Sequence, residues 1–288
     1  MASGWVRAMS RSIVCLAVAA LLALAGSSAY AAKPGGGGGG GGSTYPSSMD
    51  ALGDSITRAF NTCSFPFTDC TQNSWATGTS SSVNSFYSRL LKLNRNINGR
   101  NYNDAVTGAK MTDLQGQASN AVSRGAQLVT IEMGSNDACT SSTSNMTDVA
   151  TYQSQFQSAM NTLTSGLPTA QIRVASLPDA YQLWVLFHTS SSAVNTWNAY
   201  GICQSLLANA TSTAQADVDR RALVRQREID FNSALANVCA QYTQCKFDGN
   251  TGFNTAFSTG DVSTRDYFHP SVSGQALLAS REWSAIGF

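Results

Sequence analysis

Ser55 and His269 are the side chains in this sequence whose types best suit nucleophilic chemistry. Ser55 follows a short apolar run, and a strand that ends there before a helix would expose its hydroxyl and aim backbone N–H groups at an incoming oxyanion. The imidazole of His269 can accept the hydroxyl proton at neutral pH. Asp266 lies three residues earlier, so one turn of chain would bring its carboxylate to the other ring nitrogen. These residue types together predict acyl transfer through a covalent serine intermediate.

A negatively charged intermediate also needs hydrogen-bond donors. Gly108 can present its backbone N–H with no side chain in the way, and Asn136 carries a side-chain amide. Together with the N–H of Ser55 they form the predicted oxyanion hole. Considered singly, Ser55 could be a plain helix N-cap, Gly108 a turn glycine and Asn136 an ordinary loop residue.

Four short segments in this order strengthen the functional interpretation. They read GDSIT at 53–57, NDAVTGA at 103–109, GSND at 134–137 and DYFHP at 266–270. In type and order they resemble the sequence blocks of the SGNH (GDSL) hydrolase superfamily. Ile56 stands where some members carry leucine, a change that preserves bulk. The rival G-x-S-x-G elbow of α/β-hydrolases fits less well, because Thr57 replaces its second glycine.

The resemblance implies both a fold and an activity. The fold is a three-layer α/β/α sandwich with a mainly parallel, flavodoxin-like central sheet. The activity is that of a serine esterase that needs no metal or other cofactor. The implied catalytic residues are Ser55, Asp266 and His269, and the implied oxyanion hole is made by Ser55, Gly108 and Asn136. The length of the exported chain, its six cysteines and the segment 128–137 resemble those of extracellular lipases and phospholipase-B-type members of this superfamily.

The rest of the chain predicts alternating strands and helices. We expect strands at 48–52, 101–106, 128–133, 172–177 and 245–247, and helices at 83–93, 149–163, 224–242 and 273–283. Apolar strands alternating with helices predict a parallel sheet covered on both faces. Ligands gather at the carboxyl ends of such strands. Polar residues follow three of these strands, at 54–55, 107–108 and 135–137.

The amino-terminal region predicts export. Arg7 and Arg11 precede an apolar run at 13–25, and an A-x-A cleavage site follows at 29–31, so residues 1–31 are interpreted as a signal peptide. An uncleaved anchor is the alternative, although the run is shorter than the roughly 20 residues of a membrane span. Residues 32–47, with glycine from 35 to 42, predict a flexible linker. The catalytic domain is expected at 48–288, in a secreted protein.

The cysteines fit an oxidising compartment. Apart from Cys15 in the leader there are six, an even number that suggests disulfides, although many pairings are open to six cysteines. Short loops favour Cys63–Cys70 and Cys239–Cys245, which leaves Cys139–Cys203. A free catalytic thiol is the rival interpretation, but no histidine neighbours any cysteine in sequence.

Composition excludes some partners. The net charge is +1 and only 12% of residues are charged, which argues against a nucleic-acid partner. The chain has 2 histidines, so a multi-histidine metal centre is disfavoured. His188 has no acid near it and is interpreted as a surface or pocket-rim residue. We expect a monomer.

Two further segments leave their roles open. The run YQLWVLF at 181–187 is either core or the lining of an acyl groove or lid. Arginines at 220, 221, 225 and 227 alternate with acidic residues, which predicts a solvated helix face with i,i+4 ion pairs.

The predicted function is a secreted serine carboxylic-ester hydrolase, with lipid or phospholipid acyl esters favoured. A lipidic substrate would bring transient contact with a lipid interface. A carbohydrate acetylesterase on the same fold is the alternative ester class, and a catalytically inactive binding module is the alternative outside enzymes.

Overall fold

The computed structural model describes residues 44–288. The predicted signal peptide and the glycine run therefore lie outside the described residues. At the centre is a sheet of five parallel strands in the order β2-β1-β3-β4-β5. The strands are β1 (Met49–Gly53), β2 (Asn101–Asn103), β3 (Leu128–Glu132), β4 (Gln171–Val174) and β5 (Cys245–Phe247). The predicted parallel α/β fold is confirmed.

The register of the two central strands aligns their carboxyl ends. Met49 of β1 pairs with Leu128 of β3, and the pairing continues to Gly53 beside Glu132. Both strands are buried along their whole length, as apolar runs in a doubly covered sheet should be. The segments that leave β1 and β3 therefore emerge side by side at one edge of the sheet.

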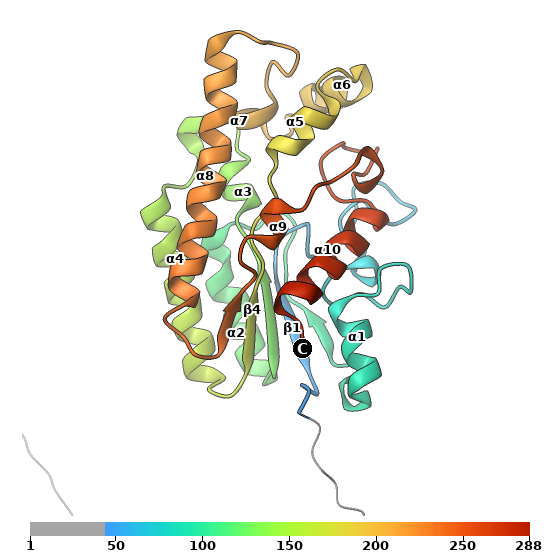
Figure 1. The fold of residues 1–288 in the computed structure, drawn as a ribbon, viewed down its shortest axis with the longest axis vertical. Helices are drawn as coiled ribbons and strands as arrows, with labels where there is room; N and C mark the ends of the chain where they lie inside the picture. The colour runs from blue at the N-terminus through green and yellow to red at the C-terminus, as the bar shows by residue number, and fades with distance from the viewer. Residues whose placement is uncertain (1–43) are drawn as a thin grey trace, which may run out of the picture. The chain divides into compact units, whose positions relative to one another are not determined.

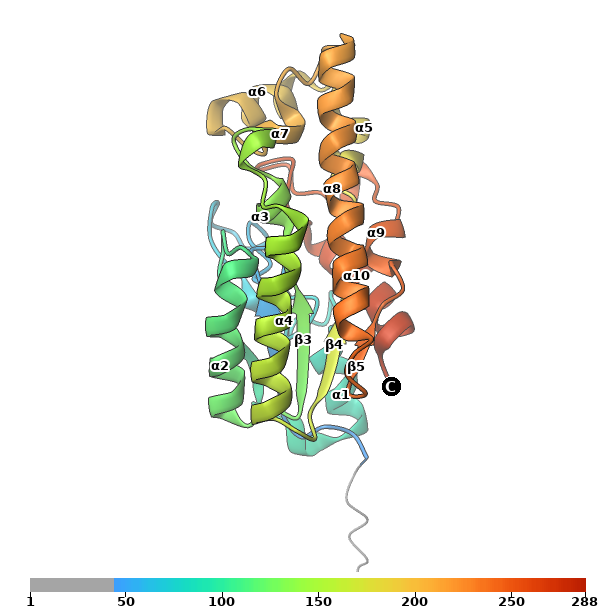
Figure 2. The ribbon, with the colours of Figure 1, turned by 90° about the vertical axis from the view of Figure 1, so that its left-hand side faces the viewer.

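Helices cover both faces of the sheet (Figures 1 and 2). On one face lie α2 (Leu114–Arg124), α4 (Val149–Gly166) and α8 (Gln215–Cys239), and on the other lie α1 (Phe86–Leu93) and α10 (Val272–Ile286). Alternate residues of β1 supply both cores: Leu52 packs with the first group, and Met49 and Ala51 pack with the second. This is the predicted α/β/α layering.

Local sequence explains where the helices begin. The Asp148 side chain accepts a hydrogen bond from Thr151 N at 2.9 Å and caps α4, and the Ser271 hydroxyl caps α10 through Gly274 N at 3.2 Å. In α4 the buried residues recur at spacings of three and four, so the helix holds one apolar face to the sheet.

Several short helices lie at the carboxyl end of the sheet. These helices were not predicted from the sequence. They include α5 (Tyr181–Phe187), α6 (Ser191–Tyr200) and α7 (Gln204–Leu207), which lie above the strands in Figure 1. The others are α3 (Ser135–Ala138) and α9 (Thr251–Asn254). The 3₁₀ turns of the described residues lie in the connections between these elements, at Thr71–Asn73, Arg95–Ile97, Met111–Asp113, Thr143–Asn145 and Thr259–Asp261.

No regular helix follows Ser55, so that part of the prediction is wrong. Residues 54–61 form successive turns in which Phe60 N bonds to the carbonyl of Ser55 at 3.0 Å. Ala59 and Asn61 have φ values of 51° and 64°, and this left-handed backbone prevents a helix from propagating. The strand expected at 101–106 is also shorter, ending at Asn103.

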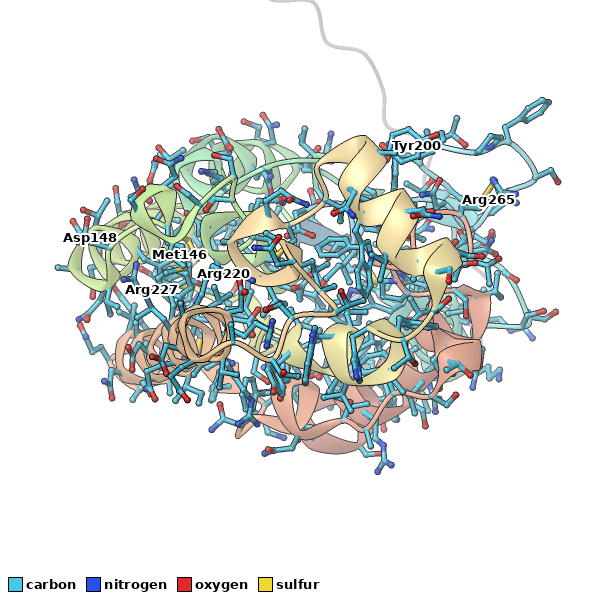
Figure 3. All side chains as sticks on the ribbon, turned by 90° about the horizontal axis from the view of Figure 1, so that it is seen from above. Met146, Asp148, Tyr200, Arg220, Arg227 and Arg265 are labelled. Atoms are coloured by element: carbon cyan, nitrogen blue, oxygen red, sulfur yellow. A yellow bond between two sulfur atoms is a disulfide. The ribbon has the colours of Figure 1, made fainter. Side chains whose placement is uncertain are left out.

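The arginine cluster of α8 is not the solvated face that the sequence predicts. Arg221 is buried and lies over the Trp184 ring, 4.4 Å from its centroid. Arg225 pairs with Asp179 at 2.9 Å. Arg227 donates to the carbonyl of Thr147, beside Met146 and Asp148 in Figure 3. Arg225 and Arg227 therefore join α8 to loops that are distant in sequence.

Three disulfides join Cys63 to Cys70, Cys139 to Cys203 and Cys239 to Cys245. This pairing confirms the one that loop length and elimination favoured.

The folded region begins slightly before residue 48. Asn94 Nδ2 donates to the carbonyl of Tyr45 at 2.8 Å, and Ser47 N donates to Gln127 at 2.8 Å, so the last residues assigned to the linker are bonded to the domain. Within residues 44–288, no helix has the length and apolar character needed to cross a membrane.

Candidate active site

Ser55 lies two residues beyond β1, at the carboxyl edge of the sheet. The chain can make this exit only because residue 53 is glycine: a Cβ there would lie 2.3 Å from the carbonyl oxygen of Glu132. Asp54 then closes the turn by accepting a hydrogen bond from Ile56 N at 2.9 Å. The tight turn fixes the position of the Ser55 hydroxyl against the strand end.

Ser55, His269 and Asp266 form one hydrogen-bonded row. Ser55 Oγ lies 2.8 Å from His269 Nε2, and His269 Nδ1 lies 2.7 Å from Asp266 Oδ2. Ser55 and Asp266 are buried, whereas the His269 side chain keeps a small exposed surface. The structure thus joins a hydroxyl, an imidazole and a carboxylate that are 214 residues apart at the widest.

The 266–269 turn holds the imidazole through backbone bonds. Asp266 Oδ1 accepts from Phe268 N at 2.9 Å and from His269 N at 3.0 Å, while Tyr267 adopts a left-handed φ of 53°. Burial acts to raise the pKa of Asp266, but hydrogen bonds from the His269 ring and the two backbone N–H groups outweigh it, so that pKa lies below its usual value. The carboxylate is therefore held charged, facing the ring nitrogen.

Asn136 and Gly108 lie at the same edge. Asn136 Nδ2 donates to the carbonyl of Ala109 at 2.9 Å and approaches Asp54 Oδ2 at 3.4 Å. Gly108 precedes Ala109 and has a φ of 84°, a conformation that glycine adopts without strain. The turn that contains it is tied to β1, because Val106 N donates to the carbonyl of Gly53 at 3.1 Å. The amide of Asn136 thus joins the second and third motif segments to the first.

Two buried carboxyl groups support this edge. Burial raises the pKa of Asp54 to about 7, with Asp137 adding to the rise and Ile56 N and His269 opposing it. Asp137 accepts from Met111 N at 2.8 Å and from the Thr147 hydroxyl at 2.7 Å, so it holds neighbouring loops.

Sequence comparison agrees with this arrangement. Residues 51–282 match the family model for GDSL-like lipase/acylhydrolase proteins. The chain belongs to this family. Membership implies hydrolysis of ester bonds. No curated protein matches this GDSL hydrolase in sequence.

Solved structures resemble this GDSL hydrolase at low sequence identity. The extracellular lipase of Streptomyces rimosus is 16% identical over 83% of this chain and 99% of its own, with a TM-score of 0.48. A family 3 carbohydrate esterase of Clostridium thermocellum is 11% identical over 83% and 94%, with a TM-score of 0.48. Phospholipase A1 of Streptomyces albidoflavus NA297 is 14% identical over 79% and 94%, with a TM-score of 0.42.

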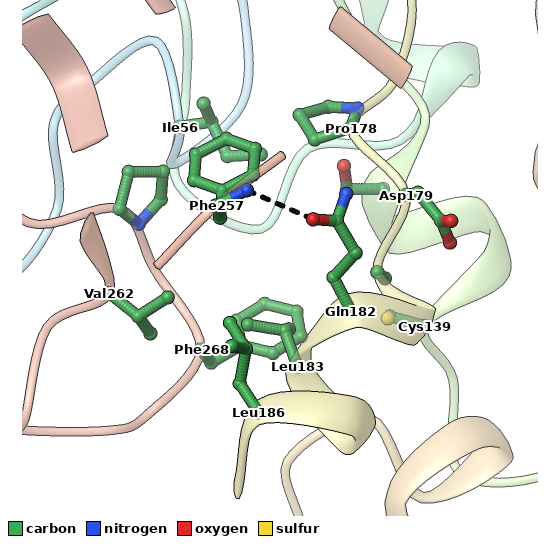
Figure 4. A pocket seen from close by; sticks show the side chains of 13 residues that line it. Ile56, Cys139, Pro178, Asp179, Gln182, Leu183, Leu186, Phe257, Val262 and Phe268 are labelled. Carbon is green, nitrogen blue, oxygen red and sulfur yellow. Dashed lines mark hydrogen bonds between the residues drawn. The ribbon is translucent and has the colours of Figure 1, made fainter. Parts of the chain in front are cut away.

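An apolar pocket of this GDSL hydrolase is lined by residues that neighbour Ser55 and His269 in sequence (Figure 4). Its cavity volume is about 50 Å³. Ile56, which follows the serine, and Phe268, which precedes the histidine, lie in its wall with Leu183 and Leu186 of α5. The Gln182 side chain forms one side of the pocket. Its Oε1 accepts from Phe257 N and its Nε2 donates to the carbonyl of Thr255, both at 3.0 Å. The segment 181–187 therefore lines a groove at the site, one of the two roles left open by its sequence.

Asn61 is a site residue that sequence reasoning missed. It is buried, and its Nδ2 donates to Asp266 Oδ2 while its Oδ1 accepts from Phe67 N at 2.5 Å. The one local signal is its place just before Cys63, at the neck of the loop closed by the Cys63–Cys70 disulfide.

The second histidine lies elsewhere. His188 ends α5, stacks on Trp184 with ring centroids 4.4 Å apart, and its Nδ1 lies 2.9 Å from the Trp184 carbonyl. In the part of the chain that the structure describes, no group of 3 or more His, Cys, Asp or Glu side chains is arranged to hold a metal ion.

Proposed function

We propose that this GDSL hydrolase cleaves carboxylic esters through an acyl-enzyme on Ser55, with His269 as base and Asp266 as the acid that orients it. The observation that carries the proposal is the row of hydrogen bonds from Ser55 Oγ through His269 to Asp266, 2.8 and 2.7 Å long, next to residues that line an apolar pocket. A nucleophile, a base and an orienting carboxylate at these distances are the parts that acyl transfer requires.

The proposed reaction has two halves. Ser55 Oγ attacks the ester carbonyl carbon while its proton passes to His269 Nε2, and the negative charge forms on the carbonyl oxygen. The N–H groups of Ser55 and Gly108 and the Asn136 amide stabilise that oxyanion. The C–O bond to the alcohol then breaks, and the alcohol leaves with the proton from Nε2. Water attacks the acyl-enzyme by the same route and releases the acid.

The acyl group is assigned to the apolar pocket. Leu183, Leu186, Phe257, Val262 and Phe268 supply hydrocarbon and aromatic surface there, which suits an apolar acyl group. Each buried methylene contributes about 0.8 kcal/mol, so the pocket favours lipid acyl chains over acetyl groups. A carbohydrate acetylesterase would leave this surface unfilled.

Export is part of the proposal. Three disulfides persist only where the surroundings oxidise thiols, which fits secretion after cleavage of residues 1–31.

The test is hydrolysis of p-nitrophenyl esters from acetate to laurate by the wild type and by Ser55→Ala. We expect kcat/KM to increase with acyl length in the wild type, and the folded variant to lose nearly all turnover. A preference for acetate would favour the carbohydrate acetylesterase, and full activity of Ser55→Ala would remove the assigned nucleophile.

A further inference from the structure

A second depression lies beside the hydrogen-bonded row of Ser55, His269 and Asp266. It has a volume of about 290 Å³, and His269 and Asn136 both lie in its wall. Its other walls are largely apolar and include Phe60, Phe67 and Tyr200. We call it the aromatic depression. Phe268 and Cys139 line both it and the apolar pocket, so they form the partition between the two.

Two aromatic side chains form its rim from elements far apart in sequence. The rings of Phe67 and Tyr200 lie 5.2 Å apart between centroids, yet 46% of Phe67 and 63% of Tyr200 are exposed. Deeper in, the Phe60 ring lies 4.9 Å from the His269 ring. In Figure 3, Tyr200 lies on the same side of the molecule as Arg265, away from Arg220 and Arg227. Apolar rings gathered at a site but open to water are typical of a surface that a ligand covers.

The rim is held in place rather than left to move freely. Phe67 has a φ of 54°, which is uncommon for a bulky residue and is maintained by the hydrogen bond from its N–H to Asn61 Oδ1. The Cys63–Cys70 disulfide closes its loop, and Arg265 donates to the carbonyl of Ser64 at 2.8 Å. Backbone strain held at a site of this kind points to a positioned contact.

Proton transfer decides which half of an ester this depression receives. The leaving alcohol oxygen must reach His269 Nε2 to take its proton. His269 lies in the wall of the aromatic depression, whereas the apolar pocket is lined by its neighbours Phe268 and Pro270. Resting on the proposed function, we propose that the aromatic depression binds the alcohol half of the ester, and that this alcohol carries an uncharged apolar group packed against Phe67 and Tyr200.

The charge of the residues that line the aromatic depression limits which class of alcohol it can bind. Among the described residues that line the aromatic depression there is no lysine or arginine, and the carboxylate present is that of Asp266. A phosphorylated alcohol would find no cation to pair with there. The shared chemistry is therefore a neutral apolar alcohol, whether an alkyl or aryl alcohol or a glycerol that keeps its other acyl chains.

The experiment varies the alcohol while the acyl group stays constant. Ethyl and octyl butyrate, each kept below its solubility limit, are hydrolysed by the wild type, Phe67→Ser and Tyr200→Ser, and acid release is measured. We expect the ratio of kcat/KM for octyl over ethyl butyrate to fall about fivefold in each variant, since each loses one aromatic contact. Phe65→Ser is the matched control: Phe65 is in the same disulfide loop and 77% exposed, but does not line the depression, and its ratio should stay within about twofold of the wild type.

A second set of substrates, two glycerides, distinguishes simple apolar alcohols from a glycerol that keeps its other acyl chains. Monobutyrin and dissolved tributyrin differ in the acyl chains that the leaving alcohol retains. If the tributyrin preference falls in Phe67→Ser and Tyr200→Ser, the inference extends to glycerides; if only the octyl preference falls, it holds for simple alcohols alone.

Other outcomes overturn the inference. Unchanged ratios in Phe67→Ser and Tyr200→Ser would do so, while hydrolysis that depends on Ser55 would leave the proposed function standing. Absence of any ester hydrolysis would instead remove the proposed function. If Phe65→Ser lowers activity as much as Phe67→Ser, and only on emulsified or vesicle substrate, the rim is a lipid-docking surface and the alcohol assignment is wrong.

Discussion

Asn61 donates its side-chain amide to the same Asp266 oxygen that lies 2.7 Å from His269 Nδ1. The carbonyl oxygen of the Asn61 side chain accepts from Phe67 N. One buried amide therefore connects the Asp266 carboxylate, which faces the imidazole, to the disulfide-closed loop that carries Phe67. We infer that Asn61 is a positioning residue for Asp266.

Replacing Asn61 should alter the pH dependence of activity. Asn61→Leu removes a hydrogen-bond donor from the charged Asp266 carboxylate, so the pKa of that carboxyl should rise and the acid limb of the kcat/KM profile should move to higher pH. A hydrogen bond to a charged group contributes about 1.5–3 kcal/mol, which predicts a loss of about 10- to 100-fold in kcat/KM.

The matched control is Asn94→Leu. Asn94 is also buried and its amide bonds the carbonyls of Tyr45 and Pro46, at 2.8 and 3.1 Å, but it lies near the amino-terminal start of β1. It should lower stability without moving the pH profile. An Asn61→Leu enzyme with lowered stability and an unshifted profile would refute the positioning role.

The Asn136 amide should act on the transition state. Asn136→Ala is expected to lower kcat by about 10²–10³, equivalent to about 2.7–4 kcal/mol, with little change in KM, because the developing oxyanion needs the donor more than the bound ester does. Steady-state kinetics on p-nitrophenyl butyrate measure this, and exposed Asn145→Ala serves as the control. An equal loss of kcat/KM that came only from a higher KM would show that the amide binds substrate and gives no extra stabilisation to the oxyanion.

The strands and the site motifs could be predicted because their signals are local. The runs that form β1 and β3 are apolar and end in polar residues, and the Cys63–Cys70 and Cys239–Cys245 loops are too short to leave many pairings. Ser55, Asp266 and His269 were identified from residue type and order, and the structure brings them within hydrogen-bond distance.

What could not be predicted depends on contacts between distant segments. Asn61 lies in a stretch of turns that has no periodicity, and its partner Asp266 is 205 residues away. The α8 arginines alternate with acids in sequence, yet Arg225 and Arg227 find partners on loops that only folding brings near. Residue type alone does not reveal such partners.

Two buried carboxyls should make stability depend on pH. Glu132 at the end of β3 and Glu282 on α10 are buried, which raises the pKa of both well above the usual range. Asp54 and Glu282 add to the rise in the pKa of Glu132, and Asp248 adds to the rise in that of Glu282. The folded state then holds protons that the unfolded state releases, so stability falls as pH rises above about 4.5, the ordinary glutamate range. Glu282→Gln removes one such group.

The measurement is urea unfolding at pH 5 and pH 8. Relative to wild type, Glu282→Gln should be more stable at pH 8 than at pH 5, by about 1.4 kcal/mol for each unit of pKa shift spanned between them. Exposed Ser280→Ala, on the same helix, changes no titratable group and serves as a control with no such difference. A larger gain at pH 5 would contradict the account.

The disulfides should differ in their contribution to stability. The Cys139–Cys203 bridge spans 64 residues and the Cys239–Cys245 bridge spans 6. Closure of the longer loop removes more entropy from the unfolded chain, so replacing both cysteines by alanine should cost about 4 kcal/mol for the first bridge and about 2 kcal/mol for the second. Denaturant unfolding of the two double variants compares them, and an equal or reversed order would argue against this entropic explanation.

The most direct test of the proposed chemistry is covalent labelling of the nucleophile. A fluorophosphonate reacts with a serine hydroxyl whose proton a histidine can accept, and peptide mass spectrometry locates the adduct. We predict one adduct per chain on the peptide that contains Ser55, much slower formation in His269→Ala, and none in Ser55→Ala. A folded wild-type protein that forms no adduct, or an adduct that persists in Ser55→Ala, would contradict the assignment of Ser55 as the nucleophile.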